Sequence, residues 1–118
     1  MIDVNIETIK PAGGSGTDVS VIKLIGEVDA TNAVIVQQKV MPLSVPGCRL
    51  ILDLSKVAYM SSAGLRMLLS LYRQTSARQG NIVLVGLSAE LKDTMSMTGF
   101  LGYFTVEDSL EAGLQVLG

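Results

Sequence analysis

The alternation of apolar and polar residues along the chain predicts five strands. Residues 2–6 alternate regularly, which is typical of a strand with one exposed face. Residues 19–25 are more apolar, and the continuous apolar run in residues 49–53 is typical of a central parallel strand that is covered on both faces. Residues 82–85 repeat this run, and residues 103–106 predict a short last strand.

Helical patterns lie between the later strands. The first predicted helix covers about residues 30–41, with Asp29 as its N-cap, and it ends before Pro42 because proline cannot donate to the helical ladder. The second predicted helix follows a pair of serines, Ser61 and Ser62, extends to about Gln79 and is closed by Gly80. Its leucines recur at the spacing that lines one face of a helix.

Two shorter helices are predicted in the C-terminal part of the chain. Ser88 is the expected N-cap of a helix that ends near Thr98, with Gly99 as the glycine that follows its last turn. Residues 108–111 form a capping-box pattern, which opens a last helix that runs to Leu117.

The resulting order of elements is ββαβαβαβα, which predicts an α/β fold. We expect a mixed, mostly parallel sheet with helices packed on it and right-handed crossovers between parallel strands. Residues 11–18 lack the lysine of a phosphate-binding loop, so they are predicted to be a hairpin connection between the first two strands. With no internal repeat or linker, residues 1–118 are predicted to form a single domain.

The composition excludes several classes of function. The 118 residues contain no histidine, which removes the commonest general base, and Cys48 is the sole cysteine, which excludes an intrachain disulfide and a thiolate zinc site. The formal charge of −2 and the lack of a basic stripe argue against direct binding to nucleic acid. The N-terminus does not resemble a signal peptide, and no apolar run approaches the roughly 20 residues of a membrane span. We therefore expect a cytoplasmic protein with no membrane contact.

The strongest candidate site is the hydroxyl-rich corner that follows the strand at residues 49–53. This buried strand leads to Ser61 and Ser62 at the start of a helix, near solvent. N-capping explains only one serine, and the small residues Ala63 and Gly64 would let a partner's backbone or a phosphate approach closely. A phosphoryl group on either serine would face the positive end of the helix macrodipole, so the fold should tolerate it.

A catalytic serine is the least favoured interpretation of this corner. A nucleophilic serine needs a base within hydrogen-bond reach, and the chain has no histidine. Ser62 also lacks the preceding glycine of a nucleophile elbow. Lys23 or Lys56 could serve as the base only in an unusual arrangement. A hydrolase that uses Ser62 is therefore not expected.

Other side chains are expected near the corner or at the surface. The carboxyl ends of adjacent parallel strands share one edge of a sheet, so Asp29 is expected on the same rim as Ser62. Asp53 is expected to hold the turn after its strand. Met67 and Leu71 lie off the predicted core-facing stripe of their helix, and Met67 is predicted to belong to a binding interface.

The motifs around the corner resemble those of a known family. Residues 53–57 and 60–65, the latter with the sequence Met-Ser-Ser-Ala-Gly-Leu, are similar to the signature of STAS domains, and especially of the bacterial anti-sigma factor antagonists. Residues 26–29 and 97–100 resemble two weaker motifs of the family. The resemblance covers essentially the whole chain and implies a STAS-like fold.

The resemblance also implies a phosphorylation switch. In this family the unmodified domain binds an anti-sigma factor, which frees the sigma factor to join RNA polymerase. The anti-sigma factor is also a kinase that phosphorylates one serine at the start of this helix, and a phosphatase removes the phosphate. Counting from Gly64, the acceptor is Ser62. The antagonists often carry Asp before the acceptor and a hydroxyl residue after it, where this chain has Ser61 and Ala63, so Ser61 is a rival acceptor.

The resemblance thus predicts an anti-sigma factor antagonist, a binding module with no enzymatic activity and no cofactor, whose kinase partner consumes ATP. Its expected partners are the anti-sigma factor/serine kinase and a phosphoserine phosphatase, and the free protein is expected to be a monomer. The predicted partner-binding residues are Asp29, Met60, Ser61, Ala63, Gly64, Arg66 and Met67. The alternative is a STAS scaffold or nucleotide-binding module of a stress-signalling or transport complex that is not phosphorylated.

Overall fold

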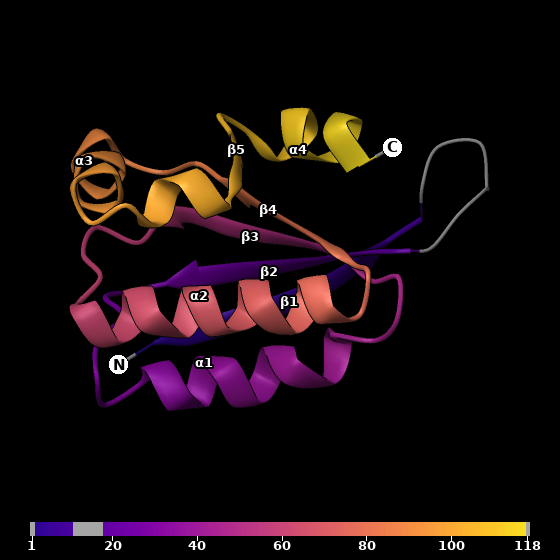
Figure 1. Cartoon of the computed structure of the whole chain (residues 1–118), viewed down its shortest axis with the longest axis horizontal. Helices are drawn as coiled ribbons and strands as arrows, with labels where there is room; N and C mark the ends of the chain where they lie inside the picture. Colours follow the sequence, from indigo (N-terminus) through magenta and orange to yellow (C-terminus); the bar gives the residue numbers. More distant parts are fainter. Residues whose placement is uncertain (1, 11–17, 118) are drawn as a thin grey trace.

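A mixed sheet forms the centre of the structure, a computed structural model that describes residues 2–10 and 18–117. Its strands lie side by side in chain order (Figure 1) and are β1 (Asp3–Ile9), β2 (Val19–Ile25), β3 (Arg49–Lys56), β4 (Asn81–Val85) and β5 (Thr105–Glu107). β1 is antiparallel to β2, and each later pair is parallel. The predicted α/β class is therefore confirmed, whereas most of the predicted hairpin connection lies outside the described residues.

The helices of the described residues are α1 (Ala33–Val40), α2 (Ser62–Ala77), α3 (Ala89–Met97) and α4 (Leu110–Leu117), with the short 3-10 turns η1 (Met41–Leu43) and η2 (Phe100–Tyr103). The sequence did not predict η2. α1 begins later than expected, and β3 continues past Asp53, so Asp53 lies inside a strand, where its carboxylate accepts the N–H of Ser55 at 3.0 Å. Within residues 2–10 and 18–117, no helix is both long enough and apolar enough to cross a membrane.

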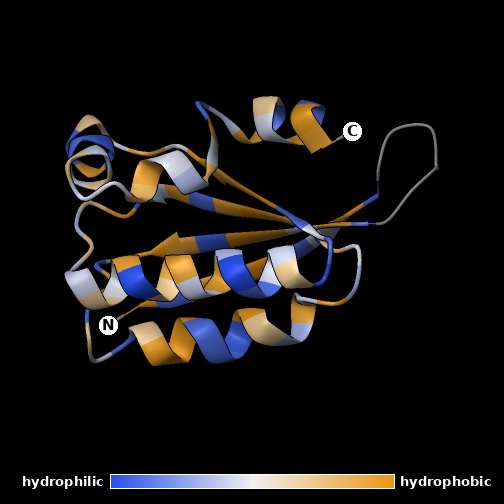
Figure 2. Cartoon of the chain, in the orientation of Figure 1, coloured by the Kyte–Doolittle hydropathy of each residue, from blue (hydrophilic) through white to orange (hydrophobic). Residues whose placement is uncertain are grey.

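Successive residues of the central strands face two different layers. Ile22, Leu52 and Leu84 pack in the cluster that joins the sheet to α1, α2 and α3. Ile51 and Val83 pack in a second cluster, which α4 covers. Figure 1 shows α1 and α2 side by side on one side of the sheet and α4 on the other, and Figure 2 shows that the central strands are mostly hydrophobic. Both faces of the central strands are thus buried, as their apolar runs predict.

The buried stripe of α2 is wider than the sequence predicted. Leu65 and Leu68 are buried as expected, but Met67 and Leu71 are also only 3 % and 1 % exposed. α2 packs on the sheet and also on α1, so two adjacent sides of the helix are covered. The prediction that Met67 and Leu71 lie off the core-facing stripe is therefore wrong.

The predicted helix ends are confirmed in part. The hydroxyl of Ser88 accepts the N–H of Leu91 at 3.1 Å, and Gly99 has the left-handed backbone (φ 81°) expected after a helix. At the start of α4, however, the hydroxyl of Ser109 accepts the N–H of Ala112 at 3.1 Å. The cap is therefore one residue later than Asp108, the first residue of the predicted capping box.

The end of α2 also differs from the prediction. Gln79, and not Gly80, has a positive φ, of 60°. Gly80 is needed for a different reason, because a Cβ atom there would lie 2.5 Å from the sulfur of the buried Cys48. A glycine is therefore needed at position 80 because there is no room for a Cβ atom beneath the turn, and not because of the backbone conformation.

Candidate functional site

The candidate corner forms where the segments that follow β2 and β3 come together. Val28 and Met60 pair as an isolated parallel bridge beyond the ends of the two strands. The N–H of Val28 donates to the carbonyl of Tyr59 at 3.1 Å, and the N–H of Ser61 donates to the carbonyl of Val28 at 2.8 Å. These bonds hold Asp29, the next residue along the chain, beside the start of α2, as the sequence predicts for adjacent parallel strands.

The two serines of the corner have different roles in the fold. Ser61 is the N-cap of α2: its backbone is extended (φ −72°, ψ 172°), and its hydroxyl accepts the N–H of Gly64 at 3.3 Å. Ser62 is the first helical residue and is exposed. Within residues 2–10 and 18–117 its hydroxyl has no hydrogen-bond partner. The Ser62 hydroxyl can therefore react without loss of the cap.

Asp29 is held in a turn and is not the predicted N-cap of α1. Its carboxylate accepts hydrogen bonds from the hydroxyl and the N–H of Thr31, the latter at 2.9 Å. The bond from the hydroxyl, followed by that from the N–H, lowers the pKa of the Asp29 carboxyl below its ordinary value. Asp29 therefore carries a negative charge at neutral pH.

The N-cap position of α1 is Asn32, a residue that sequence analysis missed, and its side chain makes no capping bond to the helix. Asn32 is buried, and its side-chain oxygen accepts the N–H of Asp29 at 2.9 Å while its amide donates to the carbonyl of Glu27 at 2.9 Å. This amide fixes the loop that carries Asp29. The available signal was an asparagine just before an apolar helical pattern, which is typical of a cap or turn.

Three predicted partner contacts are buried instead. Met60 and Met67 are each 3 % exposed, so the prediction that they offer exposed apolar contacts is wrong. Gly64 is also buried, and a Cβ atom there would lie 2.4 Å from Cγ of Met60 and 2.9 Å from Cγ1 of Val28. Gly64 therefore lets α2 pack closely on the Val28–Met60 bridge and leaves no space for a partner.

The surface that remains consists of Asp29, Ser61, Ser62, Ala63 and Arg66, which we call the serine corner. Ser62 and Arg66 are exposed, and the other three are partly buried. Ser62 and Arg66 are four residues apart on α2, so their side chains share one face of the helix. Among the residues that the structure describes, no group of three or more His, Cys, Asp or Glu side chains could hold a metal ion.

Comparison with known proteins identifies several relatives. The family model of the STAS domain matches residues 15–113. The anti-sigma-B factor antagonist of Listeria monocytogenes is 36% identical over 84 residues, which are 70% of this chain and 74% of that protein. BtrV of Bordetella bronchiseptica, named as a candidate anti-sigma factor antagonist, is 41% identical over 64 residues. That match spans about half of each protein, 54% of this chain and 55% of BtrV.

Solved structures show the same fold. The anti-sigma factor antagonist SpoIIAA in its unphosphorylated form matches with a TM-score of 0.72 and 20% identity, covering 98% of this chain and 99% of that one. The phosphorylated form of SpoIIAA from Bacillus gives a TM-score of 0.71 with 18% identity, covering 98% of this chain and 100% of that one. At 20% and 18% identity, these two structures show only that the fold is the same. The STAS family model, in contrast, matches the sequence itself over residues 15–113. The chain belongs to the STAS domain family.

Proposed function

We propose that this protein is an anti-sigma factor antagonist whose binding is switched by phosphorylation of Ser62. In its unphosphorylated form it binds an anti-sigma factor that is also a serine kinase, and the sigma factor is released. The kinase uses ATP to phosphorylate Ser62, and a phosphatase reverses the modification. The protein itself is a binding module and not an enzyme. The names of the Listeria and Bordetella relatives support this proposal.

The observation that carries the proposal is the free, exposed hydroxyl of Ser62 beside a capping Ser61. A phosphate on Ser62 would leave intact both the cap bond to Gly64 and the bond from Ser61 to Val28. The first N–H groups of the helix and its macrodipole favour an anion at this position. Phosphorylation would therefore change the surface of the protein and preserve the fold.

A phosphate would strongly alter the charge of the serine corner. It would add a charge of about −1.5 to −2 next to the anionic Asp29. Two neighbouring negative groups would repel an acidic partner surface and would be costly to bury against an apolar one. SpoIIAA, which has the same fold, has been solved with and without its phosphate, and this supports a modification that the fold accommodates.

Ser61 is the weaker candidate for the acceptor. It is partly buried, its N–H is bonded to Val28, and its hydroxyl oxygen already accepts from Gly64. A phosphate on Ser61 would have to replace the cap of α2. The proposal therefore assigns the modification to Ser62.

The variant Ser62→Asp tests the switch because it places a negative charge at the proposed phosphate position. We expect it to abolish binding to the purified anti-sigma kinase of the same organism, measured by isothermal titration calorimetry. The midpoint of thermal unfolding should stay nearly unchanged, since an acid is favourable in the first turn of a helix. Ser62→Asn, which has almost the same shape and no charge, is the matched control and should retain binding.

Undiminished binding by Ser62→Asp would contradict the proposed switch. Saturable binding of a nucleotide to the purified protein, weakened by Asp29→Asn, would favour the alternative ligand-binding module. These two results are independent, since one measures a protein partner and the other a small molecule.

A further inference from the structure

The outward side of α2 carries positive charges and no negative ones. Arg66 and Arg73 are seven residues apart, close to two helical turns, and lie on the same outward stripe as Ser62. Both arginines are exposed. Neither α1 nor α2 contains an Asp or Glu residue. No carboxylate of these two helices can therefore pair with the arginines.

The charges of the whole chain are segregated in the same way. Residues 30–89 contain six Lys or Arg residues and a single acid, Asp53. Asp53 lines a depression with Lys23 and with Leu110 of α4, so it belongs to the opposite side of the sheet. The net charge of −2 does not show that the positive and negative residues are concentrated in different parts of the sequence.

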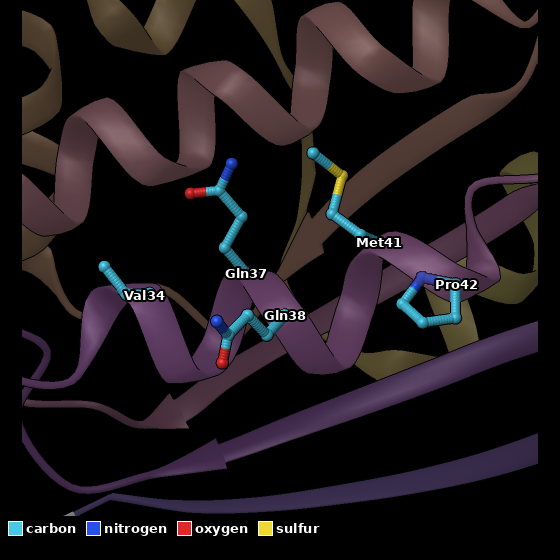
Figure 3. A pocket seen from close by; sticks show the side chains of 5 residues that line it. All are labelled: Val34, Gln37, Gln38, Met41 and Pro42. Carbon is cyan, nitrogen blue, oxygen red and sulfur yellow. The ribbon is translucent and has the colours of Figure 1, made fainter.

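A partly apolar groove runs along α1, and its smaller part reaches α2 beside the arginine stripe. Its larger part is an open depression of about 630 Å³, lined by Val34, Gln37, Gln38, Met41 and Pro42. Figure 3 shows the side chains of Gln37 and Met41 directed from α1 toward α2. A smaller part, of about 220 Å³, shares Val34 and Gln37 and reaches Ala63, Arg66 and Met67 of α2. Val34 is 57% exposed, so the groove presents apolar surface to solvent.

We propose that this groove, with Arg66 and Arg73, is the docking surface for an acidic amphipathic segment of the anti-sigma partner. The inference rests on the function proposed above and names the chemistry of that partner. Apolar side chains of the segment would cover Val34 and the groove, as an amphipathic helix does in other grooves. Its carboxylates would pair with the two arginines, since neither α1 nor α2 contains an acid of its own.

The position of Ser62 links this docking surface to the switch. The groove ends at Ala63 and Arg66, immediately after Ser62 and one turn beyond it. A phosphate on Ser62 would lie within reach of Arg66 and would pair with its guanidinium, because phosphate and guanidinium form strong charge-assisted hydrogen bonds. Phosphorylation would therefore place an internal anion where the partner's carboxylate binds.

A pair of double variants tests the docking surface in the full chain. Arg66→Gln with Arg73→Gln should weaken binding to the purified anti-sigma kinase about tenfold and reduce its dependence on salt, as expected for the loss of two exposed charge pairs. The matched control is Lys39→Gln with Lys92→Gln. It changes the net charge equally, but neither lysine lines the groove. The control should bind within about twofold of the unmodified protein.

Equal weakening by both double variants would overturn the docking surface and leave the proposed function standing, because only the net charge would then matter. A synthetic peptide of about 15 residues, with leucines on one face and glutamates on the other, tests the surface without the kinase. We expect amide NMR shifts to cluster at Val34, Gln37, Ala63 and Arg66, and to disappear when glutamines replace the glutamates. Shifts elsewhere, or none, would overturn the proposal even if the kinase binds.

Two further results would assign the same surface to a different occupant. Binding to phosphatidylserine vesicles in place of the peptide would indicate a membrane surface. Concentration-dependent dimerisation that requires these arginines, measured by sedimentation, would indicate that a second copy of the chain occupies the surface. All acidic residues of the chain except Asp53 lie outside residues 30–89, so they could supply the carboxylates in such a dimer. Either result would overturn the proposed partner.

Discussion

Ser61 and Ser62 are neighbours of the same residue type, and their surroundings give them different roles. The bond from the N–H of Ser61 to the carbonyl of Val28 keeps Ser61 outside the helix, so its hydroxyl becomes the cap. Ser62 is then the first helical residue, with an exposed hydroxyl. The sequence alone could not separate the two, because both are good caps and the deciding bond comes from another strand.

Alanine substitutions should reveal this difference as a difference in stability. Ser61→Ala removes the cap of α2 and should lower the free energy of unfolding by about 1 kcal/mol. Ser62→Ala removes an exposed hydroxyl and should change it by less than about 0.5 kcal/mol. Urea denaturation of the two variants measures both values. Equal losses, or a larger loss for Ser62→Ala, would mean that the cap has been misassigned.

At the scale of elements, local patterns predicted the strands and the start of α2 well. These patterns failed for residues that are buried by a second helix or strand, because the pattern within one element does not show which other elements pack against it. Met67 is covered because α1 packs beside α2, and Met60 is buried as it pairs with Val28 across two strand ends. The start of α1 was misplaced because a turn held by Asp29 and Asn32 precedes the helix, which begins only at Ala33.

A substitution at Gly64 tests how closely α2 packs on the Val28–Met60 bridge. Gly64→Ala should destabilise the protein by about 1–3 kcal/mol, since its Cβ atom would overlap Met60 and approach Val28. This cost exceeds the gain of about 1 kcal/mol that alanine normally gives in a helix. Gly102→Ala is the matched control, because nothing lies within 4 Å of its Cβ position, and it should be nearly neutral. Thermal unfolding in which Gly64→Ala is as stable as the control would contradict this close packing.

At the scale of the whole molecule, the fold brings together residues that the sequence keeps apart. The sheet places the loop after β2 beside the start of α2, and α1 and α2, which contain no acid, lie next to it. A phosphate at this junction would act on the charge of the surface while the core beneath remains packed. This arrangement suits a binding module that is switched without unfolding.

The most direct test of the central claim is intact-mass spectrometry with site mapping of protein isolated from its native cells, before and after phosphatase treatment. We predict a single phosphate on Ser62, removed by the phosphatase, in some growth conditions. Mapping to Ser61 would contradict the assigned acceptor. The absence of phosphate under every growth condition would contradict the switch itself.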